Sequence, residues 1–392
     1  MNRGFILTAT CAAATACSSG GTGGLETVVT DSAGVTIVTI ESMDGLPSRA
    51  ITGPVLDLAI SEDSSEASVR RVSAVRRLPD GSIIVADGGS RRLKLFGPDG
   101  IYLRTLGGSQ EDSVVVEFSG ITAIWPVARN RIAAFDQRLR RVTTLGLEGG
   151  PARVSSFSMR PGNIASVGRL ESGDVLFRNL LIDVPDSGFV STDVAITRFA
   201  EDGSFVDTVG VWPSARMGRL GRPPLQLVSS PMFEPRLIGA AAGDRLLVSD
   251  CRTPRYLVVD PENGLDRIVV WSTQLDPVTE DDIQAFRDRR LQELDAGQQR
   301  QAELFLDGMP INETLPACDQ LRIDPDGRAW VRTFLRPSAS SQTWLVFDPD
   351  GRPVFSLELS AGTRIMDVGS EHITVIERRP LDVDRILVYG IE

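Results

Sequence analysis

Hydrophobic and polar positions along the chain form one pattern that recurs several times. An apolar run of four to seven residues is followed by a tight turn with glycine, a second apolar run ending in a polar residue, a third run and another turn. The runs are rich in Val, Ile and Leu, which is typical of strands. We therefore predict repeated antiparallel strands, and the first strand of each repeat begins near residue 72, 120, 164, 237, 320 or 364.

The spacing of these starts predicts the architecture. A unit of about 45 residues fits a four-stranded antiparallel blade, and the two longer intervals fit one unit plus an insertion. Six such units predict an all-β fold, a six-bladed β-propeller of four-stranded antiparallel blades, over residues 34–392. The last unit has only three predicted strands. We expect the fourth to come from 55–60 or 34–40, because pairing the first segment with the last removes an open edge.

Aspartate–glycine pairs lie between paired apolar runs. Glycine accepts the positive φ that a tight hairpin turn requires, and a preceding proline presets the first turn position. The segment 324–327 resembles the start of a calcium loop, but it lacks the further oxygen ligands and the bidentate glutamate of such a loop. We therefore predict hairpin turns rather than metal loops at Asp80, Asp99, Asp202, Asp326 and Asp350.

Three insertions interrupt the repeats on the face that carries the loops between second and third strands. Two of them are a loop at 180–193 and a proline-rich crossover at 210–235. The third changes its apolar period from two to about 3.6. It predicts a small helical insert at 278–309, between the fourth and fifth blades.

The helical insert carries clear helix signals. Thr279 is a good N-cap, and acidic residues follow it in the first turn. We expect the first helix to end at Gly297 and the second at Gly308. The apolar stripe of the first helix consists of Ile283, Phe286, Leu291 and Leu294. This stripe either pads the outside of the neighbouring blades or covers the central funnel as a lid, and the sequence leaves both open.

The ends of the second strands supply candidate ligand-binding residues on the loop-bearing face. The aspartates among them are Asp87, Asp136 and Asp250. The arginines nearby are Arg138, Arg178, Arg252, Arg255, Arg336 and Arg378. Arginines gathered on one rim can bind a carboxylate, a phosphate or an acidic sugar through paired hydrogen bonds. They can equally pair with neighbouring aspartates, and those aspartates can bond to their own loops.

Charge and histidine content narrow the function classes. The formal net charge of −11 argues against nucleic acid or an anionic membrane surface as a partner. His372 is the single histidine, and it falls in a predicted hairpin where we expect a packing or solvent-facing role. One histidine cannot build a histidine-based metal site, and it argues against a Ser-His-Asp triad. We expect a monomer.

The first residues resemble a bacterial lipoprotein signal over 1–17, with a short apolar stretch before Cys17. We expect lipidation at Cys17 and a flexible tether over 18–33. Ala14 stands where this motif usually has Leu, so cleavage by an ordinary signal peptidase remains an alternative. The chain is expected to be exported, as a membrane-anchored lipoprotein of the bacterial cell envelope or, without lipid, as a periplasmic protein.

Two further cysteines form an even pair in a compartment that permits disulfides. Cys251 follows the second strand of the fourth blade, and Cys318 opens the first strand of the fifth blade on the same face. A bridge between them would clamp both ends of the helical insert. The alternative is two separate buried thiols.

The first repeat resembles the NHL-type repeat. The segment PDGSIIVADGGSRRLKLFGPDGIYLRTLG, at 79–107, matches most positions of that repeat, and Ser90 stands where the family usually has Asn. The segment 31–38 resembles the lead-in of exported bacterial six-bladed propellers of this type. The resemblance implies the fold and leaves the activity open, because propellers host binding proteins and enzymes alike.

Two hypotheses of function follow. The first is a non-catalytic cell-envelope propeller without a cofactor, which binds a partner protein or an anionic small molecule or glycan on its loop-bearing face. The second, implied by the resemblance, is a calcium-dependent hydrolase or lyase of the NHL-like or lactonase-like kind. A metal bound on the propeller axis would favour the second.

Overall fold

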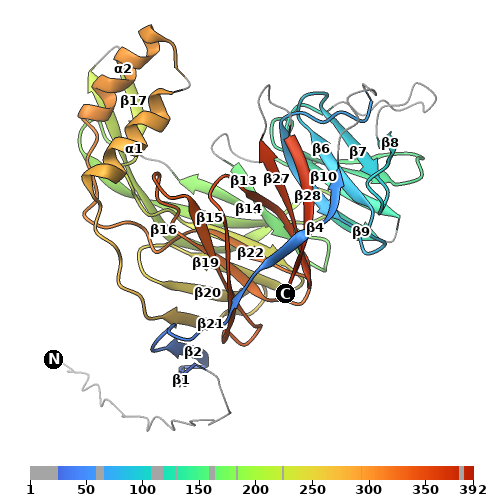
Figure 1. Ribbon diagram of the computed structural model, residues 1–392, viewed down its shortest axis with the longest axis horizontal. Helices are drawn as coiled ribbons and strands as arrows, with labels where there is room; N and C mark the ends of the chain where they lie inside the picture. Colours follow the sequence, from blue (N-terminus) through green and yellow to red (C-terminus); the bar gives the residue numbers. More distant parts are fainter. Residues whose placement is uncertain are drawn as a thin grey trace, which may run out of the picture.

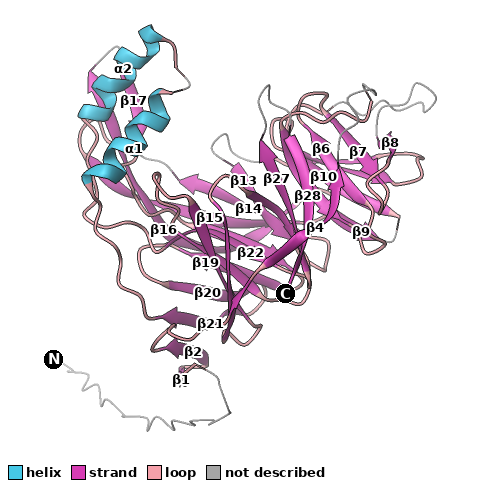
Figure 2. Cartoon of the chain, in the orientation of Figure 1, coloured by secondary structure: helices cyan, strands magenta, loops and turns pink. Residues whose placement is uncertain are grey.

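The computed structural model describes residues 25–58, 66–106, 118–128, 130–158, 164–181, 184–222, 225–292, 294–378 and 384–392. Within these residues the regular structure is almost entirely β-strand, and two helices are the exception (Figure 2). The described strands form five hydrogen-bonded sheets, in which neighbouring strands mostly follow one another along the chain. The all-β propeller arrangement of four-stranded antiparallel groups predicted from the apolar runs is confirmed.

Two sheets each hold four antiparallel strands in chain order. The first contains β5 (Val72–Arg77), β6 (Ile83–Asp87), β7 (Arg92–Phe96) and β8 (Tyr102–Leu106). The second contains β9 (Ile121–Ala128), β10 (Arg131–Asp136), β11 (Arg141–Gly146) and β12 (Arg153–Ser156). The second strand of each sheet is buried along almost its whole length. The sequence of each of these strands is therefore a continuous apolar run rather than an alternation of apolar and polar residues.

The largest sheet has 11 strands and joins two antiparallel groups. One group contains β13 (Ile164–Arg169), β14 (Val175–Leu181), β15 (Phe189–Phe199) and β16 (Phe205–Arg222). The other contains β18 (Ile238–Ala242), β19 (Arg245–Ser249), β20 (Arg255–Asp260) and β21 (Gly264–Trp271). A parallel bridge between Gly168 and Ala241 links β13 to β18. The strands of the expected third and fourth blades are therefore joined in one hydrogen-bonded sheet through this bridge.

Short strands extend this sheet at both edges. They are β17 (Leu225–Ser229), which pairs with β16, and the hairpin of β1 (Thr27–Ser32) and β2 (Val35–Ile40). The hairpin lies beside β21, near the lower edge of Figure 1.

The last two sheets each take a strand from the N-terminal part of the chain. One contains β22 (Cys318–Ile323), β23 (Ala329–Thr333), β24 (Ser341–Phe347), β25 (Pro353–Ser360) and, at its outer edge, β3 (Ser48–Arg49). The other contains β26 (Arg364–Val368), β27 (His372–Arg378), β28 (Asp384–Ile391) and β4 (Ile51–Leu58).

The strand β4 closes the sheet that lacked a fourth predicted strand. It pairs with β28 in antiparallel register, with Leu58 opposite Ile386. Of the two N-terminal candidates, the segment 55–60 is therefore right as far as residue 58, where the described range ends. The other candidate, 34–40, contains the whole of β2, which pairs in parallel with β21. The carboxylate of Asp384 also accepts a hydrogen bond from the amide of Val72 at 2.5 Å, which ties β28 to β5.

The aspartate–glycine pairs form the predicted hairpin turns. The glycines Gly81, Gly100, Gly203, Gly327 and Gly351 all have φ between +77° and +93°. The carboxylates of Asp80, Asp99 and Asp202 support three of these turns by accepting a hydrogen bond from a backbone amide two residues later. Asp80, for example, accepts a hydrogen bond from the amide of Ser82 at 2.9 Å.

The helical insert lies along the chain between β21 and β22, as α1 (Glu280–Leu291) and α2 (Ala296–Asp307). Thr279 caps α1 and Gly308 caps the C-terminus of α2, as predicted. Gly297 does not end α1, which corrects the sequence prediction. It lies in the first turn of α2, because Asp295 caps that helix and accepts a hydrogen bond from the Gly297 amide at 3.0 Å. No helix in the described residues is long and apolar enough to cross a membrane.

The segment predicted as a crossover at 210–235 is instead largely a long hairpin. Strand β16 continues to Arg222, and the chain returns as β17. The pairing of β15 with β16 reaches Phe189, so the loop predicted at 180–193 is shorter than expected. Because α2 contacts β16, the hairpin and the helices stand together at the upper left of Figure 1.

Candidate ligand pocket

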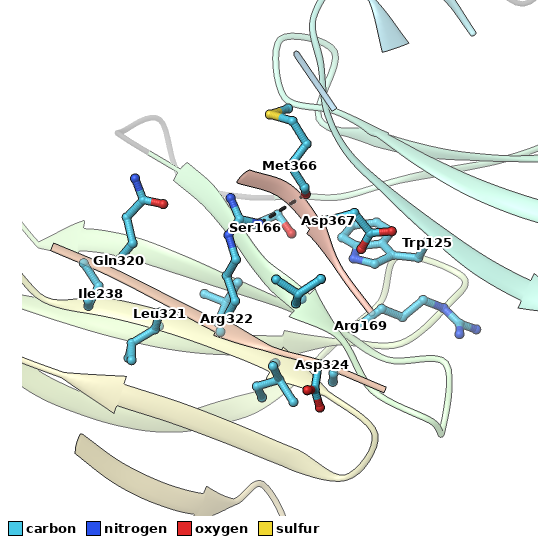
Figure 3. Close-up of a pocket in the computed structure, with 18 of the residues that line it drawn as sticks. Trp125, Ser166, Arg169, Ile238, Gln320, Leu321, Arg322, Asp324, Met366 and Asp367 are labelled. Carbon is cyan, nitrogen blue, oxygen red and sulfur yellow. Dashed lines mark hydrogen bonds between the residues drawn. The ribbon is translucent and has the colours of Figure 1, made fainter. Parts of the chain in front are cut away.

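An axial pocket of about 550 Å³ lies where the first strands of the antiparallel groups converge (Figure 3). Most of its lining comes from β5, β9, β13, β18, β22 and β26, and Arg178 of β14 adds to it. This shared lining is the geometry of a propeller axis, on which the innermost strand of each blade faces the same channel.

The charged groups of the axial pocket are largely tied to its own wall. Arg76 on β5 lies 2.6 Å from the carboxylate of Asp367 on β26. Arg322 on β22 donates a hydrogen bond to the carbonyl of Met366 at 3.2 Å, drawn as a dashed line in Figure 3. Desolvation lowers the pKa of Arg322 to about 10, against the opposing effect of the Asp367 charge. These contacts join β5, β22 and β26 around the axis. The charged side chains here therefore have a structural role.

A second pocket of about 560 Å³ adjoins the axial one, because Arg178, Ile238 and Asp319 line both. Its walls come from α1, from the chain between β17 and β18, and from the chain that follows β23. We call it the arginine pocket, after its lining arginines Arg178, Arg236, Arg289 and Arg290.

The apolar stripe of α1 holds the helix in this position. Ile283, Phe286 and Leu291 pack against a buried cluster that includes Met232 and Phe233. Phe286 then also lines the arginine pocket. The helical insert is therefore a wall of a cavity on the loop-bearing face, and not only padding on the outside.

Three arginines of this pocket have no ion-pair partner within the described ranges: Arg178, Arg236 and Arg290. One guanidinium nitrogen of Arg178 does donate a hydrogen bond to the carbonyl of Leu237, at 2.8 Å. Desolvation lowers the pKa of Arg178, and the positive charge of Arg236 lowers it further. Desolvation likewise lowers the pKa of Arg236, and the charge of Arg290 adds to that effect while Glu234 opposes it. Arg236 is thus close enough to feel the positive charge of Arg290, and Arg178 is close enough to feel that of Arg236. A site of this kind favours an anion.

The remaining arginine and the acidic groups of the pocket are engaged elsewhere. Arg289 donates to the carbonyl of Pro337 at 2.9 Å. Asp319 accepts a hydrogen bond from Arg332 at 2.6 Å. Neither acidic group of the lining forms an ion pair with these three arginines, although the charge of Glu234 still raises the pKa of Arg236.

Glu234 is the centre of a network at the back of the pocket. Its side chain is 1% exposed, and its oxygens accept hydrogen bonds from Arg216 and Arg252 and, at 3.0 Å, from Asn312. Burial alone would raise the pKa of Glu234, but the hydrogen bonds from Arg216 and Asn312 outweigh burial and lower it. The network joins β16, the chain before β18 and the chain after α2.

The arginines proposed from the sequence differ in their positions and contacts in the structure. Arg178 lines both pockets. Arg252 contacts Glu234 behind the arginine pocket, at 3.3 Å. Arg336 pairs with Asp282 in the first turn of α1 at 2.8 Å, which helps to anchor the helix.

The other proposed residues lie outside the arginine pocket. Arg255 pairs with Asp250 at 3.2 Å, and the side chain of Arg378 lies outside the described residues. Arg138 packs close to Gly120. Neither Arg255 nor Arg138 lines either of the two pockets.

The proposed aspartates are used by the fold. Asp87 accepts hydrogen bonds from the amides of Arg70 and Gly89, each at 3.0 Å, and pairs with Lys94 at 2.9 Å. Asp136 accepts from three backbone amides, those of Ser119, Gly120 and Leu139. The structure therefore supports the loop-bonding interpretation for both side chains, and it does not bring them to the arginine pocket.

The cysteine pair forms the expected bridge. Cys251 and Cys318 are joined by a disulfide, with their Cα atoms 5.0 Å apart. The bridge spans the chain segment that contains α1 and α2, and Cys318 lies in the lining of the arginine pocket. Cys17 lies outside the described residues.

The single histidine and the acidic groups show no metal geometry. His372 is half-buried, and its Nδ1 lies 3.3 Å from a guanidinium nitrogen of Arg77. Within the described part of the chain, no group of three or more His, Cys, Asp or Glu side chains is placed to hold a metal ion.

Sequence reasoning missed the decisive residues of the pocket. Arg236 precedes β18 and Arg290 is on α1, far from the ends of second strands where the candidates were sought. The signal that could have found Arg290 is the run RDRR at 287–290, within the first predicted helix. Glu234 could not be recognised, because a single acidic residue in a loop shows nothing about burial.

Comparisons with known proteins support the fold. No protein-family model matches the chain, and no curated protein matches it. Among solved structures, a member of the DUF4221 family from Bacteroides vulgatus is 9% identical, with 88% of this chain and 99% of that chain covered and a TM-score of 0.53.

Two further solved structures are similar at lower scores. One is an exported protein from Bacteroides fragilis, 10% identical, with 91% of this chain and 99% of that chain covered and a TM-score of 0.45. The other is regucalcin, a calcium-binding protein from Agrobacterium tumefaciens, 11% identical, with coverage of 88% and 96% and a TM-score of 0.43. At these identities the likeness extends to the fold alone, and the chain is a β-propeller.

Proposed function

We propose that this chain is a non-catalytic binding protein that takes an anionic ligand in the arginine pocket on its loop-bearing face. The observation that carries the proposal is the set Arg178, Arg236 and Arg290, which face one cavity and have no ion pair within the described ranges. Other arginines near the pocket, such as Arg216 and Arg336, are paired with carboxylates.

The electrostatics explain why an anion would bind there. Like charges that lie close together cost free energy, and a bound anion removes that cost. Arg178 is half-buried, whereas Arg236 and Arg290 are exposed at the cavity. Guanidinium groups also donate paired hydrogen bonds to a carboxylate or phosphate. The cavity volume of about 560 Å³ falls in the range of small-molecule sites.

Calorimetric titration at low salt tests this function, with inorganic phosphate and glucuronate as probes. We expect saturable binding that weakens at least about tenfold in Arg236→Gln and in Arg178→Gln, because a charged hydrogen bond contributes about 1.5–3 kcal/mol. The control is Arg104→Gln, which removes an exposed arginine of β8 and should leave affinity unchanged. Equal loss in all three variants, or no binding by the wild type, would contradict the proposal.

We also propose that the ring has six blades of the NHL type. The 11-stranded sheet then counts as two blades, β13–β16 and β18–β21, which touch through a single parallel bridge. The repeat resemblance at 79–107 supports the type. An experimental structure with five or seven radial sheets around the axis would contradict the count.

Export and lipid attachment at Cys17 are part of the same proposal. The lipoprotein-like signal supports them, and the disulfide between Cys251 and Cys318 fits an oxidising compartment. Labelling of cells with radioactive palmitate should mark the wild-type chain and not Cys17→Ala. Equal labelling of both would contradict lipidation at this residue. A monomer is expected, and the charge of −11 argues against nucleic acid as the ligand.

The calcium-dependent alternative rests on the family resemblance. No observation in the described part of the chain favours it.

A further inference from the structure

The arginine pocket has two chemically different sides. Besides its unpaired arginines, the lining includes Phe233, Phe286 and Phe334, together with Met309 and Leu335, which we call the aromatic side. The ring of Phe233 lies 5.5 Å from that of Phe286 and 6.2 Å from that of Phe334, centroid to centroid. The aromatic side is therefore a packed surface and not a scatter of single residues.

The aromatic side is only partly covered by the protein itself. Phe233 is buried, but Phe286, Met309 and Phe334 are half-buried and line the cavity. Apolar surface in contact with water costs free energy that a matching apolar ligand would recover. A purely hydrophilic anion, such as a sugar acid, would leave these apolar side chains in contact with water.

The two sides meet at α1. The guanidinium carbon of Arg290 lies 5.5 Å from the centre of the Phe286 ring, so a cation sits over the edge of the apolar surface. One end of a ligand can then reach Arg236 and Arg290 while its other end lies on the phenylalanines. This is the arrangement that an amphipathic molecule requires.

Resting on the proposed function, we propose that the ligand is a free amphipathic acid, with one carboxylate at the arginines and an unbranched acyl body on the aromatic side. An acyl chain of roughly ten to fourteen carbons fits a cavity of this size. The flexible side chains of Met309 and Leu335 suit a flexible chain, because methionine adapts to irregular surfaces.

A chain-length series tests the proposal. Octanoate, decanoate and dodecanoate are titrated calorimetrically into the full exported chain, below their micelle concentrations, beside inorganic phosphate and glucuronate. We expect affinity to rise about tenfold for every two methylenes, since each buried methylene is favourable. Arg236→Gln should weaken every acid at least about tenfold. Decanol, which has no charge, should bind at least about tenfold more weakly than decanoate.

Variants separate the two sides of the pocket. Phe334→Ala should flatten the chain-length dependence and leave phosphate affinity unchanged, and circular dichroism checks that the variant is folded. If Phe334→Ala does not fold, the chain-length series and the decanol comparison with the wild-type protein test the proposal by themselves.

The outcomes distinguish this inference from the function it rests on. Binding of phosphate and glucuronate that depends on Arg236, with no gain for longer acids, overturns the acyl ligand and leaves the anion site standing. Absence of binding by all probes overturns both. Dodecanoate binding that Arg236→Gln does not change would be nonspecific and overturns the inference. Sedimentation of the protein with phosphatidylglycerol vesicles, lost in Arg236→Gln, would point to a membrane lipid and overturn the free acid.

Discussion

At the residue scale, the carboxylate of Glu234 decides how the arginines of the loop-bearing face are divided. It is buried and accepts hydrogen bonds from Arg216, Arg252 and Asn312, so it neutralises the arginines behind the pocket. Arg236, two residues along the chain, has no such partner within the described ranges. Glu234 therefore separates Arg216 and Arg252, which it binds, from Arg236, with which it forms no ion pair.

The first prediction concerns the pH dependence that Glu234 creates. Its pKa is lowered from the ordinary value of 4.5, so its stabilising effect is complete above that value and is lost as pH falls through the lower folded-state pKa. Glu234→Gln should lower the free energy of unfolding by about 2 kcal/mol at neutral pH. Urea unfolding between about pH 6 and pH 3 should show a smaller acid-side loss in the variant than in the wild type. Parallel curves for the two proteins would contradict this role.

The second prediction concerns Gly168, where the inner strands β13 and β18 meet. A Cβ atom at this position would lie 2.0 Å from the carbonyl oxygen of Ala241, which is backbone and cannot turn aside. Gly168→Ala should therefore destabilise the protein by about 2 kcal/mol or more. Gly53→Ala in β4 is the control, because nothing lies within 4 Å of its added Cβ. Thermal unfolding that ranks the two variants equally would count against this close approach.

At the element scale, the N-terminal strands show the limit of pattern reading. The segments 34–40 and 55–60 both alternate or cluster apolar residues, and either could have completed the last sheet. Contacts between segments far apart in the sequence decide which of the two segments pairs with β28, and the apolar pattern does not contain them. One such contact is the ion pair of Asp57 with Arg385 across β4 and β28. The long hairpin of β16 and β17 was missed for a related reason, because its prolines and glycines resembled a loop.

The third prediction tests β4 as the closing strand. Leu58 is 2% exposed in this strand, whereas Val55 is 65% exposed. Leu58→Ala should lower the free energy of unfolding by about 2–4 kcal/mol, and Val55→Ala should change it by less than about 0.5 kcal/mol. Denaturant titration of both variants measures the difference. Similar small effects would mean that β4 is not packed against the ring in solution.

The fourth prediction concerns the disulfide that clamps the helical insert. Alkylation of the unfolded, unreduced mature protein should label neither Cys251 nor Cys318, and reduction beforehand should add two labels by intact mass. Reduction should also weaken anion binding, because the bridge holds the two ends of the chain segment that carries α1. Two labels without reduction would show that the bridge does not form.

At the scale of the whole molecule, the propeller was predictable because its repeats are local. Each apolar run and each Asp-Gly turn is specified within about 45 residues, so the pattern survives in one sequence. The arginine pocket was not predictable, because Arg178, Arg236 and Arg290 come from three distant segments that only the ring and the helical insert bring together. Of the proposed site arginines, Arg178 alone lines this cavity.

The most direct test of the account is a crystal structure of the protein grown with selenate, a heavier analogue of common oxyanions. An anomalous difference map at the selenium edge should show a peak in the arginine pocket, about 3–4 Å from the guanidinium groups of at least two of Arg178, Arg236 and Arg290. The peak should disappear in Arg236→Gln crystals grown in the same way. Selenate found only in the axial pocket or on the outer surface, with the arginine pocket empty, would contradict the account.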